Sequence, residues 1–308
     1  MNAGARLAVY GIGLLVAFGA AFGLAKVIVP PSAVSEWTKG AEMNEHEGHG
    51  VSATAPAESA DAATAALKGL SLSSDGFMLS PVVAPSGVGE AGELSFRITD
   101  AEGAPVTDYE TAHDKELHLI VVRSDGSLFR HVHPTMDDAT GTWSLPWEWT
   151  EPGTYRVFAD FTPGADAASL TLTRTVHVAG DFAPVVPEPT RVANVDGFTV
   201  SLDGDLQAGT VSDLVLNVTR DGQPVTTLEP YLGAFGHLVA LRDGDLAYLH
   251  VHAEGEEPGA GETSGPEIAF AAEAPTPGRY LLYLDFQVDG QVHTAEFVLE
   301  AEHHGDGA

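Results

Sequence analysis

The chain has 308 residues, of which 44% are hydrophobic, so it is long enough for two hydrophobic cores of ordinary domain size. Only 14 Lys and Arg stand against 44 Asp and Glu, and the net charge of −30 makes DNA and RNA poor partners because it repels their phosphates. Cysteine is absent, which excludes disulfides, iron–sulfur clusters and thiolate metal sites, so any metal ion must be held by His, carboxylate or Met.

Residues 1–30 are predicted to form a transmembrane anchor. Residues 7–25 carry no charged side chain and lie between Arg6 and Lys26, which is long enough to span the hydrocarbon core of a bilayer. A cleavable signal peptide is the alternative, because small residues such as Ala25 suit a cleavage site. Both interpretations export the rest of the chain. We expect a single-pass protein of the cell membrane whose C-terminal part is extracytoplasmic.

Residues 31–71 are predicted to form a flexible tether, because they are rich in Ala, Ser, Glu and Thr and offer few large apolar side chains to bury. His46 and His49 lie in this tether among acidic residues, and the tail at residues 302–308 also combines histidines with acidic residues. Such tracts can capture metal ions loosely, and the alternative is that they are only polar filler.

The rest of the chain repeats itself, which predicts two domains of one fold. Residues 118–123 (His-Leu-Ile-Val-Val-Arg) recur as residues 237–242 (His-Leu-Val-Ala-Leu-Arg), shifted by 119 positions. Residues 153–161 recur as residues 278–286, shifted by 125 positions. The second repeat therefore holds six additional residues between these two segments.

Each repeat has the sequence pattern of short β-strands separated by turns. Runs rich in Val, Leu, Thr, Phe and Tyr are separated by turn pairs such as Asp125-Gly126 and Asp221-Gly222. About seven short strands in roughly 100 residues are typical of an immunoglobulin-like sandwich. We predict an all-β protein with two tandem immunoglobulin-like antiparallel β-sandwich domains, at residues 72–180 and 190–301.

Three histidines of the first repeat are expected to converge. Two strand-like runs flank Asp125-Gly126, and a two-residue turn centred there makes the numbers of opposed residues sum to 251. His118 then lies opposite His133, and His131 lies two residues along on the same face. Opposed Cβ atoms are about 4.5 to 5.5 Å apart, so the ring nitrogens can reach one metal ion at about 2.0 to 2.1 Å.

His113 is a candidate fourth ligand of the first repeat. The shift of 119 places Leu232 at its position in the second repeat, so the first site is expected to bind more tightly. The expected ligands of the second repeat are His237, His250 and His252. These three share one face of a hairpin as long as its register sum is odd.

The face that carries His118 continues through Ile120 and Val122, so the imidazoles lie at the end of an apolar surface. The alternative is that they are histidines at the edge of a core, satisfied by backbone hydrogen bonds. The recurrence of the three histidines favours metal binding. Nitrogen ligands without a thiolate suit Cu(II) or Zn(II), and the affinity order places Cu(II) first.

The histidine hairpin of the first repeat resembles that of bacterial exported, membrane-anchored proteins of the YtkA-like and heavy-metal-binding type, which are similar in architecture to CopC-like immunoglobulin sandwiches. Residues 113–122 and 129–134 carry the resemblance. It implies metal handling in the cell envelope, most simply of copper, with His118, His131 and His133 as ligands. The second repeat lacks the first histidine and the final proline of the pattern.

No nucleophile–base arrangement or glycine-rich phosphate loop indicates an enzyme. We therefore expect a non-catalytic module that binds or delivers a metal ion outside the cytoplasmic membrane, and a membrane metal transporter is the partner that such a module would serve. The alternative from another class is a structural or adhesive sandwich protein whose histidines only stabilise hairpins. That protein would fold normally without metal and would take up none.

Overall fold

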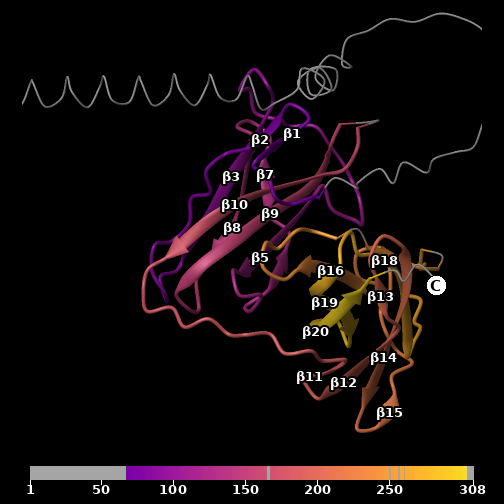
Figure 1. Cartoon of the computed structure of the whole chain (residues 1–308). Helices are drawn as coiled ribbons and strands as arrows, with labels where there is room; N and C mark the ends of the chain where they lie inside the picture. The colour runs from indigo at the N-terminus through magenta and orange to yellow at the C-terminus, as the bar shows by residue number, and fades with distance from the viewer. Residues whose placement is uncertain (1–66, 165–166, 250, 256, 260, 304–308) are drawn as a thin grey trace, which may run out of the picture. The chain divides into compact units, whose positions relative to one another are not determined.

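The computed structural model describes residues 67–164, 167–249, 251–255, 257–259 and 261–303, which form β-strands and no helix (Figure 1). The predicted all-β class is confirmed. The predicted anchor and most of the predicted tether lie outside the described residues, among which no helix is long and apolar enough to cross a membrane. The described part begins within the expected tether, where the carbonyl of Ser71 accepts a hydrogen bond from Thr173 N and that of Lys68 accepts one from Tyr248 N.

The first repeat consists of two sheets around one core. Their strand orders are β1-β2-β3-β8-β7 and β10-β9-β5-β6, with β4 paired to β9. In β3, Leu94, Phe96 and Ile98 are buried while Glu93 and Arg97 are exposed, so one face of this sheet meets the core and the other meets water. The strands are β1 (Ser73–Ser74), β2 (Phe77–Leu79), β3 (Gly92–Thr99), β4 (Tyr109–Glu110), β5 (Leu117–Arg123), β6 (Arg130–Val132), β7 (Thr135–Asp137), β8 (Thr142–Trp147), β9 (Gly153–Pro163) and β10 (Leu170–Val178).

The second repeat has the same plan. Its strand orders are β11-β12-β14-β18-β17, with β15 paired to β14, and β13-β20-β19-β16. The pairing of β13 with β20 is parallel, and the other ladders of named strands are antiparallel. The strands are β11 (Val192–Val195), β12 (Phe198–Asp203), β13 (Leu206–Gln207), β14 (Val211–Arg220), β15 (Gln223–Pro224), β16 (His237–Arg242), β17 (Val251–Ala253), β18 (Glu267–Glu273), β19 (Gly278–Val288) and β20 (Gln291–Glu302).

Strand β5 is buried on both of its faces. Leu117, Leu119 and Val121 belong to the core of the first repeat. Ile120 and Val122, on the opposite face, belong to a separate apolar cluster that includes residues of the second repeat. An outward face that is apolar must be covered, and here the other repeat covers it.

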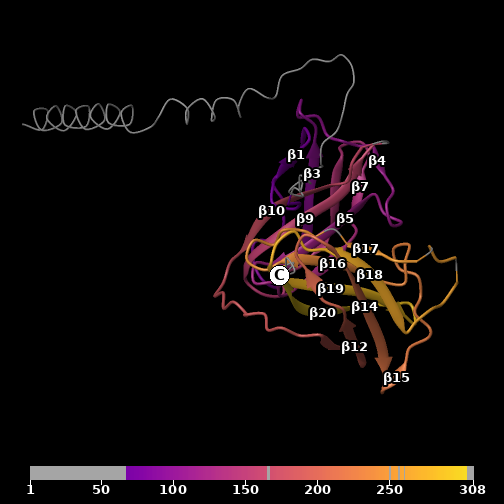
Figure 2. The same cartoon turned by 45° about the vertical axis from the view of Figure 1, so that its right-hand side comes forward.

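We call this shared apolar cluster the seam. Both repeats belong to one compact unit, residues 63–308, and Figures 1 and 2 show β5 and β9 lying beside β16 and β19. The ring of Phe129 stacks on that of Tyr283 with centroids 4.0 Å apart, and Phe158 lies 6.1 Å from Tyr248. A shift of 119 positions takes Phe129 to Tyr248, and a shift of 125 positions takes Phe158 to Tyr283. The two ring pairs are therefore equivalent, and each repeat contacts the other through the same part of its surface. The other members of the seam are Ile120, Val122, Val239, Leu241, Leu246, Leu281 and Val298.

The hairpin loop of the first repeat is docked on the second repeat through Gly126. The hydroxyl of Tyr283 donates a hydrogen bond to the carbonyl of Gly126. Gly126 has a φ of +82°, and a Cβ atom added there would lie 2.3 Å from Cδ1 of Leu281. This position therefore needs glycine for its left-handed backbone and also for the close approach of the seam.

We expect Gly126→Ala to lower the free energy of unfolding by about 2 to 5 kcal/mol, because left-handed strain and overpacking add. Gly222→Ala is the matched control, since Gly222 has a φ of +72° and nothing within 4 Å of an added Cβ. It should cost only about 1 to 2 kcal/mol. Urea denaturation of both variants measures the difference, and equal losses would show that the loop does not press on the second repeat.

Candidate metal centre

The hairpin β5–β6 places two histidines of the first repeat on the face that meets the seam. Leu119 is opposite Val132 and Ile120 is opposite His131, so the residue numbers sum to 251 and the predicted register is confirmed. His118 lies two residues from Ile120 on β5 and therefore shares the face of His131.

The loop of this hairpin differs from the two-residue turn that the sequence suggested. The amide of Gly126 donates to the carbonyl of Arg123, and the amide of Arg123 donates to the carbonyl of Ser127, so the loop has three residues with Gly126 left-handed. This loop alone would shift the register sum to 250. Leu128, with a φ of +56°, adds one residue to the returning strand, and the sum of 251 is restored.

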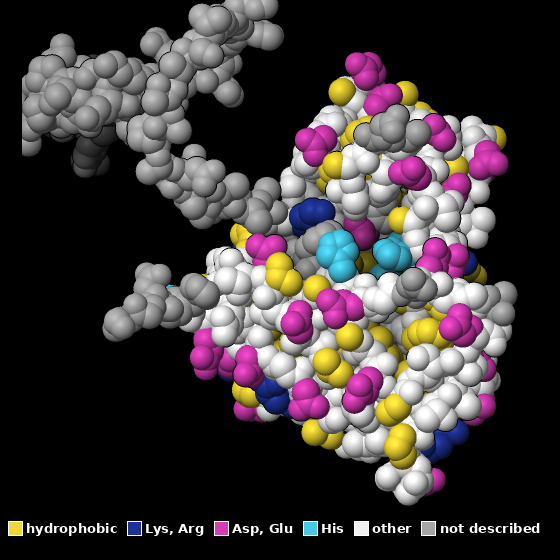
Figure 3. Space-filling view, turned by 90° about the vertical axis from the view of Figure 1, so that its right-hand side faces the viewer, with side chains coloured by type: hydrophobic (Ala, Val, Ile, Leu, Met, Phe, Trp, Pro, Cys, Tyr) yellow, Lys and Arg dark blue, Asp and Glu magenta, His cyan; other side chains and the backbone are white. Residues whose placement is uncertain are grey.

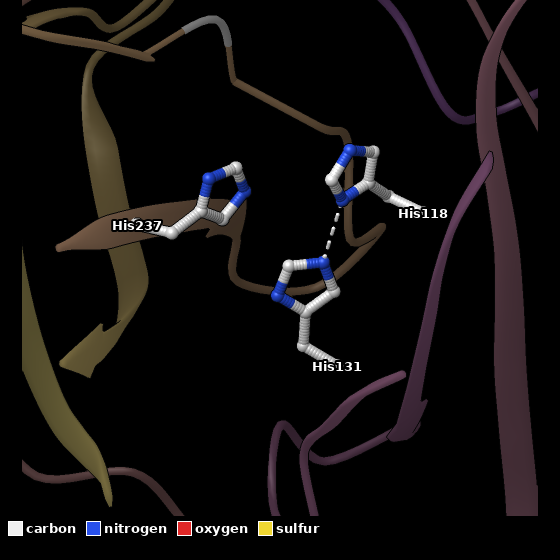
Figure 4. A group of neighbouring side chains, drawn as sticks. All are labelled: His118, His131 and His237. Atoms are coloured by element: carbon white, nitrogen blue, oxygen red, sulfur yellow. Dashed lines mark hydrogen bonds between the residues drawn. The ribbon is translucent and has the colours of Figure 1, made fainter. Parts of the chain in front are cut away.

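His237 reaches the same place from the second repeat. It begins β16, as His118 lies near the start of β5, and the two rings are parallel with centroids 5.6 Å apart. The candidate ligand nitrogens of His118, His131 and His237 all lie within 4.8 Å of one another (Figure 4). Histidines that the sequence assigned to two separate clusters therefore meet in one group across the seam.

Two more histidines of the first repeat lie beside this group. His133 Nε2 is 3.2 Å from His118 Nδ1, and its ring centroid is 4.9 Å from that of His131. His113 is exposed, has a φ of +50°, and its ring lies 6.1 Å from that of His118 and 5.7 Å from that of His237. Four of the seven sequence-predicted ligands thus surround His118 in the described structure.

The remaining two predicted ligands of the second repeat are placed differently. His252 lies on β17, which pairs with β18 in the sheet opposite β16, because the described hairpin ladder after β16 ends at the bridge between Leu241 and Tyr248. In the first repeat Val132, which corresponds to Val251, pairs with Leu119 of β5 instead. His252 therefore does not share a hairpin face with His237, although both line one cavity. His250 is outside the described residues.

Hydrogen bonds define which nitrogen of His118 is available. His118 Nε2 lies 3.0 Å from the carbonyl oxygen of Ala112, which can only accept, so Nε2 carries the proton. In the neutral ring Nδ1 is then bare. Nδ1 points at its neighbours, 3.0 Å from His131 Nε2 and 3.2 Å from His133 Nε2.

Burial keeps the rings of His118, His133 and His237 neutral. Desolvation lowers the pKa of His118 to about 4, although its hydrogen bond to Ala112 opposes the shift. Desolvation also lowers the pKa of His133 to about 3 and that of His237 well below its ordinary value, and the neighbouring histidines add to both shifts. Neutral imidazole is the form that binds a metal ion, so no proton must leave these rings at pH 7.

The donor set fits a divalent transition metal. Nitrogen ligands about 2.0 to 2.1 Å from one ion lie at most about 4.2 Å apart, so the rings need only a small inward rotation from their present spacing. Two of the three side chains are nearly inaccessible to water, with His118 5% exposed and the side chain of His131 1% exposed, while His237 is half-buried. A group of imidazole nitrogens does not suit hard cations such as Mg²⁺, which prefer oxygen ligands.

A cavity of about 190 Å³ leads to this group. It is lined by residues of both repeats, among them His113, His118, His237, His252 and the half-buried Asp160. Burial raises the pKa of Asp160. A second cavity of about 670 Å³ shares His113 and His252 with the first. Figure 3 shows histidine side chains gathered at a hollow on this face of the molecule.

Sequence reasoning missed one side chain of this centre, Asp285. Its Oδ2 lies 2.8 Å from His131 Nδ1, although the two residues belong to different repeats. Asp285 is opposite His237 in the β16–β19 ladder and is only 2% exposed. A signal was present, because an acidic residue interrupts a run of apolar residues in both repeats, as Asp160 and Asp285.

Fold and site together define a duplicated all-β protein with a buried histidine group between its two sandwiches. The chain belongs to the family described as Domain of unknown function (DUF8832), whose model matches residues 74–180 and again residues 193–303. No curated protein matches the chain.

Several solved structures are similar to the chain. They include invasin, described as a bacterial integrin-binding protein (13% identity, 73% of this chain and 39% of that chain, TM-score 0.22). They also include the Yersinia pseudotuberculosis adhesin InvE (12%, 75% and 60%, TM-score 0.21) and the fibronectin(III)-like modules of Clostridium thermocellum CbhA (9%, 75% and 100%, TM-score 0.19). The chain spans less than two thirds of the length of the first two. At such TM-scores these likenesses carry no argument about function, and the resemblance to YtkA-like and CopC-like proteins stays a prediction.

Proposed function

We propose that this protein binds one divalent transition-metal ion between its two repeats and that it handles or delivers this ion without catalysing a reaction. The observation that carries the proposal is the group formed by His118, His131 and His237, whose nitrogens lie within 4.8 Å of one another in a buried place. Because the group draws on both repeats, the proposed site is one composite centre rather than one centre per repeat.

Copper is the proposed metal, with zinc as the second choice. Imidazole nitrogen suits both ions, and for the same nitrogen donors Cu(II) binds more tightly than Zn(II). His133, whose Nε2 lies beside His118, is the proposed fourth nitrogen ligand of the metal ion. His113, at the exposed edge of the cavity, is the proposed first contact for an arriving ion.

The proposed place of action is the outer side of the cytoplasmic membrane. The support is the uncharged run at residues 7–25, which is long enough to anchor or export the chain. A membrane metal transporter is the proposed partner. The acidic surface of the chain favours approach of cations at low ionic strength.

The stoichiometry of metal binding tests the proposal. We would use the full chain with its tail histidines His46, His49, His303 and His304 replaced by Ala, so that loose binding at the tails does not contribute. Equilibrium dialysis against micromolar Cu(II) or Zn(II) should give one equivalent per chain. Competition between the two ions should favour Cu(II).

Two other outcomes are informative. Two equivalents of similar affinity would support separate sites in the two repeats and would contradict the composite centre. No uptake at micromolar free ion would show that the histidines are structural, and the function would then be sought in adhesion or protein interaction.

A further inference from the structure

The inference concerns what holds His131 in place, and it rests on the proposed metal-binding function. His131 Nδ1 lies 2.8 Å from Asp285 Oδ2, and both side chains are nearly inaccessible to water, at 1% and 3% exposure. An ionised carboxylate only accepts hydrogen bonds, so Nδ1 of His131 carries a proton, and Nε2 is the nitrogen that faces the other rings.

We propose that Asp285 is a positioning residue that fixes His131 in the tautomer and orientation in which Nε2 is the ligand atom. Nε2 of His131 lies 3.0 Å from Nδ1 of His118, and the two ring nitrogens face each other. The hydrogen bonds to Asp285 and to the Ala112 carbonyl thus turn one nitrogen of each ring toward the same point, where a metal ion would take both as ligands.

The carboxylate of Asp285 is itself rigidly held. Its Oδ1 accepts a hydrogen bond from the hydroxyl of Thr294 at 2.6 Å, so both oxygens are engaged. Asp285 and Thr294 are opposed in the β19–β20 ladder, and Asp285 is opposite His237 in the β16–β19 ladder. One short stretch of β19 therefore aligns a ligand of the second repeat and the support of a ligand from the first.

A carboxylate behind a metal-binding imidazole raises its basicity and fixes its orientation, and loss of such a partner typically costs about 10- to 100-fold in metal affinity. Asp285 supports the ring of His131 in this way across the seam. Ring orientation at His131 therefore depends on the two repeats being docked. This gives the second repeat two contributions to the centre, the ligand His237 and the support Asp285.

The tautomer of His131 can be measured without metal. Ring ¹⁵N shifts of the metal-free full chain at pH 8, assigned with a His131→Gln variant, should show a proton on Nδ1 of His131. A ring without a proton on Nδ1 would overturn the proposal. Because this measurement uses the unaltered Asp285 and no ion, it stands even if Asp285→Asn fails to fold or if the chain binds no metal.

The second measurement uses Asp285→Asn. Cu(II) affinity should fall about 10- to 100-fold, and the electron paramagnetic resonance spectrum of bound Cu(II) should change because one imidazole is reoriented. Asp196→Asn is the matched control, since Asp196 Oδ2 makes the same contact, also 2.8 Å, with Nδ1 of His293 in the second repeat. It should leave both readings unchanged.

The possible failures are distinguishable. If the unaltered chain binds no Cu(II), the proposed function fails while the tautomer still reports on Asp285. If it binds Cu(II) and Asp285→Asn binds it equally well with the same spectrum, the proposed function stands and the positioning role is overturned.

Discussion

His237→Ala should lower the affinity of the chain for Cu(II) by at least about 100-fold, more than is typical for loss of an outer hydrogen-bond partner. The substitution leaves His118, His131 and their hydrogen bonds in the first repeat intact. A large loss is expected because His237 is one of three nitrogens that converge on one point. Titration with Cu(II) against a competing chelator measures the affinity.

His293→Ala is the matched control for this variant. His293 is a buried histidine of the second repeat, 6% exposed, and it packs against Phe198 and Phe286 in the core. Its removal should destabilise the second repeat without changing Cu(II) affinity. If His237→Ala kept the affinity of the unaltered chain while His118→Ala lost it, the centre would belong to the first repeat alone.

Phe129→Ala should reduce the free energy of unfolding by about 3 to 5 kcal/mol and also weaken metal binding at least tenfold, although Phe129 is not a candidate ligand. The ring of Phe129 is stacked on Tyr283 of the other repeat at 4.0 Å, so its removal leaves a cavity in the seam. A loosened seam holds His237 and Asp285 less firmly against His131. Urea denaturation and Cu(II) titration provide the two readings.

Phe96→Ala separates the seam from general stability. Phe96 is 3% exposed and lies in the core of the first repeat, so its removal should cost a similar amount of stability. Under conditions where the variant remains folded, its Cu(II) affinity should match that of the unaltered chain. Equal metal affinities for the Phe129 and Phe96 variants would mean that the seam does not control the centre.

The duplication and the histidine hairpin were accessible from sequence because both depend on local patterns. The period of two along β5 placed His118, Ile120 and Val122 on one face, and the parity of the register placed His131 with them. The loop was not predicted in detail. Two local departures, at Gly126 and Leu128, compensate each other and leave the register sum unchanged.

The composite nature of the centre was not predictable in the same way. Apolar residues on both faces of β5 and β16 indicate that both faces are buried, but they do not say what covers the second face. The correspondence between repeats held at the loop end of the second hairpin, where Leu241 bridges Tyr248, but not at its far end, where His252 lies. In the structure β17 pairs with β18, so His252, which lies on β17, belongs to the sheet opposite β16.

Asp285 shows a further limit of pattern reasoning. The repeat alignment matched it with Asp160, yet a buried carboxylate in a strand reveals only that a partner is required. That partner, His131, is 154 positions away in sequence. Only the docking of the two repeats brings them together.

The two ring pairs of the seam, Phe129 with Tyr283 and Tyr248 with Phe158, join equivalent positions of the two repeats. A surface that is complementary to its own copy is what closes a two-fold homodimer. A chain with a single repeat would need a second chain to complete such a centre, and its metal binding would weaken as the protein was diluted. With both repeats in one chain the contact is intramolecular, at an effective concentration on the order of millimolar for a short linker. The centre is then equally complete at every protein concentration.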